Sequence, residues 1–283
     1  MLDELNMAEE IRTITRIITS KPTLEGAGVK LKRVFGHNDF REFDPFLLLD
    51  NFGSANPQDY MAGFPWHPHR GMETVTYMIR GEVKHEDSLG NKGVIKSGDV
   101  QWMTAGSGII HQEMPLLFKG KMQGLQLWIN LPQKHKMTAP KYHGFNKNEL
   151  PLLNQDKSKI ILIAGNIEDK KGAIQDKFVN IIYLDVHLQG NFVYDIAKET
   201  AFIFVYEGTA EIGGKKIFEG QCALLSKKGK ILLEGNAKLI LVAGNPLHEP
   251  VAWGGPVVMN SPKELDQAFR EIKQGKFVKE NSA

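Results

Sequence analysis

The sequence that decides the fold reads Gly63-Phe64-Pro65-Trp66-His67-Pro68-His69-Arg70-Gly71-Met72-Glu73, followed about forty residues later by Gly106-Ser107-Gly108-Ile109-Ile110-His111-Gln112-Glu113-Met114-Pro115. Each stretch holds two potential metal ligands separated by one residue, His67 and His69 in the first, His111 and Glu113 in the second. On a β-strand, residues i and i+2 point to the same face, whereas a helix separates them. The pattern therefore predicts two strands that each direct a pair of ligands to one side.

These four side chains can converge on one point if the two strands face each other across a barrel. Three imidazoles and one carboxylate suit a divalent transition metal, and Fe, Cu, Zn, Ni and Mn all accept such ligands. A single His-x-His pair is more often two exposed strand histidines, but two matched pairs with glycine turns favour a metal site. Four protein ligands leave coordination positions open, which is typical of a catalytic centre. We expect one divalent metal, whose identity the ligand set leaves open among Fe, Cu, Zn, Ni and Mn.

The composition is that of a soluble globular protein. With 24% charged residues and a formal net charge of +2 over 283 residues, the chain gives no electrostatic indication of a nucleic-acid partner or an anionic membrane. The single cysteine, Cys222, excludes an internal disulfide and is expected to lie buried in the core. The start, residues 1–5, lacks the basic and apolar segments of a signal peptide. No apolar run approaches the ~20 residues that cross a bilayer, so we expect a cytoplasmic protein.

Short β-type segments separated by glycine turns run along most of the chain. Residues 125–131 alternate apolar and polar side chains with a period of two, which is typical of a half-buried strand. Further strands are predicted at residues 14–18, 26–34, 46–49, 74–79, 83–87, 100–104, 160–164, 181–186, 202–206 and 239–242. Strands this short and frequent indicate an all-β sandwich or barrel.

The chain divides into two similar halves. Residues 132–157 are rich in Pro, Asn, Lys and His, and we interpret them as the connection between the halves. The pattern of residues 206–224 repeats that of 78–101, which indicates a diverged internal duplication without a second set of paired ligands. One helix is predicted near the end, because Ser261-Pro262-Lys263-Glu264 forms a capping box and Gly275 follows the apolar stripe.

Three segments resemble the pirin family, a branch of the cupin superfamily. They read Asp44-Pro45-Phe46-Leu47-Leu48-Leu49-Asp50, His67-Pro68-His69-Arg70-Gly71-Met72-Glu73-Thr74-Val75 and Gln101-Trp102-Met103-Thr104-Ala105-Gly106, and the resemblance extends over about residues 14–277. It implies a bicupin: two β-sandwich or barrel domains of jelly-roll type with a short C-terminal α-helix. We expect a metal-binding domain at 1–145 and a degenerate cupin domain at 146–283. Two fused cupin halves can replace the dimer of single-domain cupins, so we expect a monomer.

The resemblance also implies which carboxylate binds the metal. In general cupins the first motif supplies two histidines and often a glutamate, here Glu73. Pirins instead take the carboxylate two residues after the second-motif histidine, which is Glu113. The expected ligands are therefore His67, His69, His111 and Glu113. Glu73 faces inward only if no bulge intervenes at Gly71, and we expect it to orient a histidine ring through the free N–H of that ring.

A reaction follows from the same resemblance. Several pirins are flavonol dioxygenases (quercetinases), which implies that a flavonol binds through its 3-hydroxyl oxygen, that Glu113 acts as the catalytic base, and that O₂ opens the ring with release of CO. Phe64, Trp66, Met72 and Met103 are candidates for contact with the flat substrate, although each residue type more often fills a core. Other pirins are described as regulators. The alternative is therefore a metal- and redox-sensing protein that binds a transcription factor or a metabolic enzyme.

Overall fold

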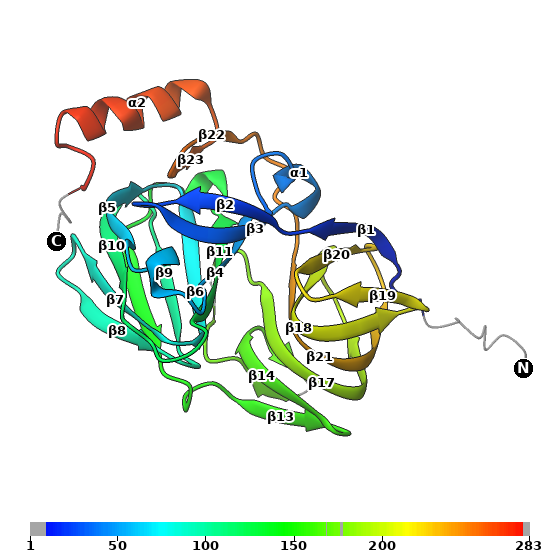
Figure 1. The fold of residues 1–283 in the computed structure, drawn as a ribbon. Coiled ribbons are helices and arrows are strands. Elements are labelled where there is room, and N and C mark those ends of the chain that lie inside the picture. The colour runs from blue at the N-terminus through cyan, green and yellow to red at the C-terminus, as the bar shows by residue number, and fades with distance from the viewer. Residues whose placement is uncertain (1–9, 168, 176–177, 280–283) are drawn as a thin grey trace, which may run out of the picture. The chain divides into compact units, whose positions relative to one another are not determined.

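The computed structural model describes residues 10–167, 169–175 and 178–279, and the chain forms two compact units (Figure 1). We call the unit that contains the histidine pairs the histidine unit; it comprises Ser20–Leu150, Ala173–Asn180 and Pro246–Ala283. We call the other the filled unit, because aliphatic side chains fill its core; it comprises Met1–Thr19, Pro151–Gly172 and Ile181–Asn245. The start of the chain, discussed above for its lack of signal-peptide features, lies outside the described residues. No helix of the described residues is long and apolar enough to cross a bilayer.

Two antiparallel sheets build the histidine unit. The larger has the strand order β12-β9-β6-β11-β4-β3-β2 and consists of β2 (Lys21–Glu25), β3 (Val29–Phe35), β4 (Phe46–Phe52), β6 (Met72–Arg80), β9 (Val100–Thr104), β11 (Gln123–Asn130) and β12 (Lys141–Phe145). The smaller has the order β5-β10-β7-β8 and consists of β5 (Phe64–His69), β7 (Glu82–Asp87), β8 (Lys92–Lys96) and β10 (Ile109–Pro115). Short helices α1 (Phe40–Phe43), η1 (Pro57–Asp59) and η2 (Gln133–His135) lie in the connections.

One core joins the two sheets of the histidine unit. Val29 and Met78 come from the larger sheet, Val83 and Ile95 come from the smaller one, and all four are buried in one cluster. Strand β10 shows why the sequence folds this way, because its residues alternate between buried and half-buried along Ile109–Pro115. This period of two places the odd-numbered residues, His111 and Glu113 among them, on the buried face.

The filled unit is built on one eight-stranded antiparallel sheet with the order β1-β20-β18-β21-β17-β14-β13, in which β19 pairs with β18. Its strands are β1 (Ile14–Thr19), β13 (Leu152–Gln155), β14 (Ser158–Ala164), β17 (Ile182–Asp195), β18 (Thr200–Ile212), β19 (Lys215–Phe218), β20 (Gln221–Leu225) and β21 (Lys230–Gly244), beside the small pair β15 (Asn166–Ile167) and β16 (Lys170–Lys171). Aliphatic side chains such as Leu184, Val186, Leu239 and Leu241 pack together in its core. Cys222 is buried, as expected.

The C-terminal segment consists of β22 (Ala252–Gly254), β23 (Val257–Met259) and helix α2 (Pro262–Lys273). The predicted capping box forms, since the hydroxyl of Ser261 accepts from the backbone N–H of Glu264. Ala268 of α2 packs with Val257 and Met259, so the helix covers β23 in the histidine unit. The structure confirms the all-β prediction and the C-terminal helix.

Two features differ from the sequence-based expectations. The segment 132–157 is not a plain connection, because it contains η2, β12 and β13, whose short alternating patterns are hidden among polar residues. The two units also do not follow a division at residues 145/146. The N-terminal strand lies in the filled unit, and the C-terminal helix lies in the histidine unit. Strand β1 pairs with β20 in the filled unit, while α2 belongs to the histidine unit. The contiguous domains 1–145 and 146–283 stay a prediction.

Candidate metal centre

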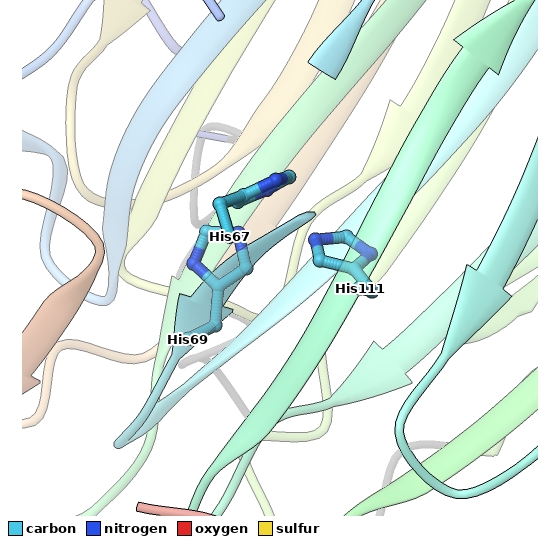
Figure 2. A group of neighbouring side chains, drawn as sticks. All are labelled: His67, His69 and His111. Atoms are coloured by element: carbon cyan, nitrogen blue, oxygen red, sulfur yellow. The ribbon is translucent and has the colours of Figure 1, made fainter. Parts of the chain in front are cut away.

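Two neighbouring strands bring three predicted ligands together. Strands β5 and β10 pair antiparallel with His67 opposite His111 and His69 opposite Ile109. The potential ligand atoms of His67, His69 and His111 all lie within 4.8 Å of one another. Figure 2 shows the three side chains close together, two from one strand and one from the other. The i, i+2 spacing and the register together produce this cluster.

Hydrogen bonds fix the orientation of two rings. Nδ1 of His67 lies 2.9 Å from the carbonyl oxygen of Pro65, and Nδ1 of His69 lies 3.2 Å from that of Pro256. A carbonyl oxygen only accepts, so each Nδ1 carries the proton and donates. In the neutral ring this leaves the Nε2 lone pair of both histidines available to a cation.

His111 provides the strongest indication that a cation belongs here. Its side chain is fully buried, and neither ring nitrogen has a hydrogen-bond partner among the described residues. A buried polar group without a partner costs about 1–3 kcal/mol. A divalent metal bound by the cluster would satisfy one of these nitrogens, so the residues present fit such a metal.

The electrostatic surroundings keep the cluster in its ligating form. Burial lowers the pKa of His69 well below its ordinary value, and the neighbouring His67 lowers it further. Burial lowers the pKa of His111 in the same way, with added effects of the other histidines nearby. Neutral imidazole is the form that binds metals, so both rings are ready to ligate at neutral pH.

Glu113 lies beside the cluster but is not part of the compact group. Its carboxylate is buried and accepts hydrogen bonds from Oγ1 of Thr76 at 3.1 Å and from Nε2 of Gln126 at 2.8 Å. Glu113 nevertheless lines the same cavity as His67 and His69. The structure therefore gathers three of the four predicted ligands tightly, and Glu113 lies in the wall of the adjoining cavity.

The side chain of Glu73 lies on one face of the larger sheet, and Glu113 lies on the other. Thr76 contacts Glu113, and residues 73 and 76 are separated by an odd number of positions on β6, so their side chains face opposite sides. The carboxylate of Glu73 accepts instead from the hydroxyl of Thr104 at 2.6 Å. The prediction that Glu73 orients a histidine ring is therefore wrong. Gly71, with φ +77°, interrupts the alternation between β5 and β6.

A cavity of about 650 Å³ adjoins the cluster. Its walls include the aromatic residues Phe64, Trp128 and Trp253 and the Asp50–Arg33 ion pair. Of the four substrate-contact candidates, Phe64 alone lines this cavity. Trp66 is half exposed, and Met72 and Met103 are buried in separate apolar clusters.

Sequence reasoning missed several residues around the site. Trp128 lies two positions after Gln126 in a strand with a period of two, so the sequence could have predicted that both side chains lie on the same face of β11. A buried network also lies beside His111, where His85 accepts from Gln101 at 3.1 Å, contacts Asp87 at 3.1 Å and has its ring centroid 5.3 Å from that of His111. The role of Trp253 carried no local signal, because it reaches the cavity from a distant part of the sequence.

The site and its fold can now be compared with known proteins. Residues 28–129, which contain both ligand strands, match the family model described as Pirin, and residues 183–278 match the one described as Pirin C-terminal cupin domain. The chain belongs to the pirin family. Its two domains are of the cupin type, as the resemblance of the motifs implied.

Individual pirin relatives span nearly the whole chain. A Pseudomonas aeruginosa protein named "Putative quercetin 2,3-dioxygenase" is 42% identical over 93% of this chain and 97% of its own length. Human pirin is 36% identical over 93% of this chain and 94% of its own length. The crystal structure of a quercetin 2,3-dioxygenase from Acinetobacter baumannii superposes with a TM-score of 0.87 at 32% identity, covering 95% of this chain and 99% of the other.

The C-terminal segment of this pirin holds the first ligand motif in place. Arg70, next to His69, donates to the backbone oxygens of Ser107 at 2.7 Å and Phe277 at 2.8 Å. The guanidinium also pairs with Glu271 of α2 at 2.8 Å and stacks over the Phe277 ring at 4.2 Å. These contacts join the ligand strand to a segment about two hundred residues later.

Lys136 holds the turn after the first ligand pair. Its buried ammonium group donates to the backbone oxygens of Gly71 at 2.9 Å and Val258 at 3.0 Å and to Oδ1 of Asn130 at 2.6 Å. Burial lowers the pKa of Lys136 to about 7, although nearby Glu249 and Glu264 act in the opposite direction. The charged form is therefore disfavoured in the folded protein.

This shift predicts a pH dependence of stability. Between pH ~7 and ~10.5 the unfolded chain binds the Lys136 proton and the folded chain does not, so the free energy of unfolding rises with pH across that window, by up to about 4 kcal/mol. Urea unfolding at pH 7 and pH 9.5 measures it. In the Lys136→Met variant the free energy of unfolding should not rise with pH in this way. An equal rise in the variant would mean that other groups cause it.

Proposed function

We propose that this protein is a metal-dependent dioxygenase that opens the ring of a flavonol-like aromatic substrate with O₂ and releases CO. The observation that carries the proposal is the three-histidine cluster bordering a cavity with aromatic walls. The names of similar proteins support the same reaction, since the Pseudomonas relative is named "Putative quercetin 2,3-dioxygenase" and the Acinetobacter structure is that of a quercetin 2,3-dioxygenase.

His67, His69 and His111 would hold the metal in this proposal, with Glu113 as the fourth ligand. The bound metal would supply Lewis-acid and redox chemistry. Trp128 and Trp253 offer flat faces against which an aromatic substrate can pack. Glu113, whose carboxylate accepts two hydrogen bonds, is positioned beside the cluster to take the proton of the substrate hydroxyl.

The charges of the cavity favour an uncharged, hydroxylated substrate. Arg33 lies in the wall, but it forms a two-pronged pair with Asp50 at 2.8 and 2.9 Å and a second pair with Glu25 at 2.9 Å. Its positive charge is therefore already matched, and an aromatic carboxylate would meet acidic groups instead. Hydroxyl groups of a flavonol can donate to these same carboxylates.

The proposal is tested by O₂ consumption and CO release with quercetin after loading with Fe(II), Ni(II), Mn(II) or Cu(II). We expect equal amounts of O₂ consumed and CO released with at least one metal. Protein stripped with a chelator is the matched control and should be inactive until metal is returned. Absence of turnover with every metal would contradict the enzymatic proposal.

A regulatory role is the second candidate, and a surface feature favours it. Trp66 immediately precedes His67 and is 50% exposed, so a partner protein could contact a residue adjacent to the metal centre. In this alternative the redox state of the metal sets the affinity for a transcription factor or metabolic enzyme. Recovery of the same partners with reduced and oxidised metal would count against it.

Metal identity, compartment and assembly complete the proposal. We propose Fe(II) as the native metal, a cytoplasmic location and a monomeric state. Metal analysis of protein purified without a chelating column addresses the first, and light scattering during gel filtration addresses the last. An oligomer in solution would contradict the monomer.

A further inference from the structure

A row of polar side chains crosses the larger sheet on the side of the cavity. Gln126 on β11 is the direct partner of Thr76 on β6 and of Asp50 on β4, and Asp50 is in turn the partner of Arg33 on β3. Adjacent strands lie about 4.8 Å apart, so the three spacings of this row cover roughly 14 Å. Gln126, Asp50 and Arg33 all line the cavity beside the histidine cluster. One wall of the cavity is therefore polar over several strands.

Asp50 is the acidic residue of this row, and its side chain is almost fully buried. Arg33 holds the carboxylate with two hydrogen bonds, from Nε to Oδ1 at 2.9 Å and from Nη2 to Oδ2 at 2.8 Å. A carboxylate has about four acceptor sites, so this pair takes only half of them. Burial raises the pKa of Asp50, although the Arg33 guanidinium acts in the opposite direction. The ionised carboxylate would therefore gain from a further hydrogen-bond donor.

Arg33 fixes the direction of the Asp50 carboxylate and is itself neutralised. Its Nη2 also pairs with Glu25 at 2.9 Å, so one cation lies between two anions. A two-pronged arginine pair restricts rotation of the carboxylate, which gives the remaining acceptor sites a defined direction. A ligand that reaches this part of the wall meets acceptors and a net negative charge. The chemistry suits a hydroxyl donor and disfavours a ligand carboxylate.

We propose that Asp50 is a specificity-determining residue that accepts a hydrogen bond from a hydroxyl group on the phenyl ring of the substrate. The substrate class is then a flavonol that is hydroxylated on the ring outside its fused ring system. This ring turns about a single bond, so its hydroxyl groups can align with a fixed carboxylate. The inference rests on the proposed function, because it names the substrate class of the same cavity.

Recognition by Asp50 differs in its consequences from a purely structural role. A hydrogen bond between a ligand hydroxyl and a carboxylate changes affinity by about 10–100-fold. An analogue without that hydroxyl loses this gain, because the site is built to receive it. If the Asp50–Arg33 pair served the fold alone, its removal would affect ligands with and without the hydroxyl equally.

The experiment compares quercetin with galangin, which is quercetin without the two hydroxyl groups of its phenyl ring. Dissociation constants are measured under nitrogen with Zn(II) added, by quenching of tryptophan fluorescence, so that no turnover is needed. Trp128 and Trp253 lie in the cavity wall and report on binding. The wild type should bind quercetin about 10–100-fold more tightly than galangin. In Asp50→Asn this ratio should fall to near one, mainly through loss of quercetin affinity.

Two further variants test whether the effect belongs to this carboxylate. Asp59→Asn makes the same change in a residue that does not line the cavity and pairs with Lys30 at 2.9 Å, so the preference for quercetin should remain. Asp50→Asn/Arg33→Gln removes the pair together and leaves no unmatched cation, and it should lose the preference as the single variant does. Circular dichroism checks that each variant is folded.

Equal affinity of the wild type for the two flavonols would overturn the proposal, and this measurement needs no variant. An unchanged preference in Asp50→Asn, or an equal loss of affinity for both ligands, would also overturn it. Loss of the preference in that variant, in a protein that consumes no O₂, would support the Asp50 assignment and remove only the dioxygenase. Turnover of both flavonols by the wild type with equal kcat/KM and equal affinity would support the dioxygenase and remove the Asp50 assignment.

Discussion

His111→Ala is expected to eliminate bound metal and to lower dioxygenase turnover by at least about 10³-fold, because metal catalysis is worth several kcal/mol of transition-state stabilisation. His111 is the one ligand supplied by β10 to the compact cluster, and it is fully buried. Metal content and O₂ consumption of the purified variant measure the effect. His143→Ala is the matched control, because that histidine is exposed on β12 and lies outside the cluster.

The two readouts separate the site from the reaction. Loss of metal together with turnover supports both the ligand assignment and the enzymatic role. A variant that retains its metal and full turnover would contradict the assignment of His111. Loss of metal in a protein whose wild type never turned over flavonol would support the site alone.

Arg12→Met is expected to destabilise the filled unit by about 3–5 kcal/mol. The Arg12 side chain is fully buried and its guanidinium donates to six backbone oxygens, those of Ile196, Lys198, Glu199, Ser226, Lys227 and Gly229. It thereby ties the segment before β1 to two loops of the same unit. Without the guanidinium, several inward-facing carbonyl groups lose their donor.

Urea unfolding followed by circular dichroism measures this loss. Lys227→Met is the matched control, because that lysine is largely exposed and, among the described residues, forms a surface ion pair with Glu199, a contact worth about 0–1 kcal/mol. Equal midpoints for the two variants would show that the buried guanidinium contributes no more than a surface cation.

Local patterns were sufficient to predict the ligand strands. His67, His69 and His111 follow a period of two within strands whose glycine turns are visible in the sequence, and the cluster needs only that these strands pair. The capping box at Ser261 is equally local, and it forms as predicted. The capping box depends only on neighbours a few residues apart, and the cluster requires in addition the pairing of β5 with β10.

Features set by distant chain segments were not predictable in this way. Glu73 points away from the cluster because the backbone at Gly71 turns, and a Cβ there would lie 1.9 Å from the carbonyl oxygen of Val258. The position of the Glu113 carboxylate depends on Gln126 and Thr76, which come from two other strands. Pro256, which orients His69, is 187 positions away along the chain.

The central claim is that His67, His69 and His111 bind one divalent metal at a site open to a small molecule. Anomalous diffraction from crystals of the metal-loaded protein, measured at the absorption edge of that metal, tests this most directly. The account predicts one peak at about 2.0–2.2 Å from a ring nitrogen of each histidine, on the side of the cavity lined by Trp128. A fully loaded protein with no peak between these three rings, or with its peak elsewhere, would contradict it.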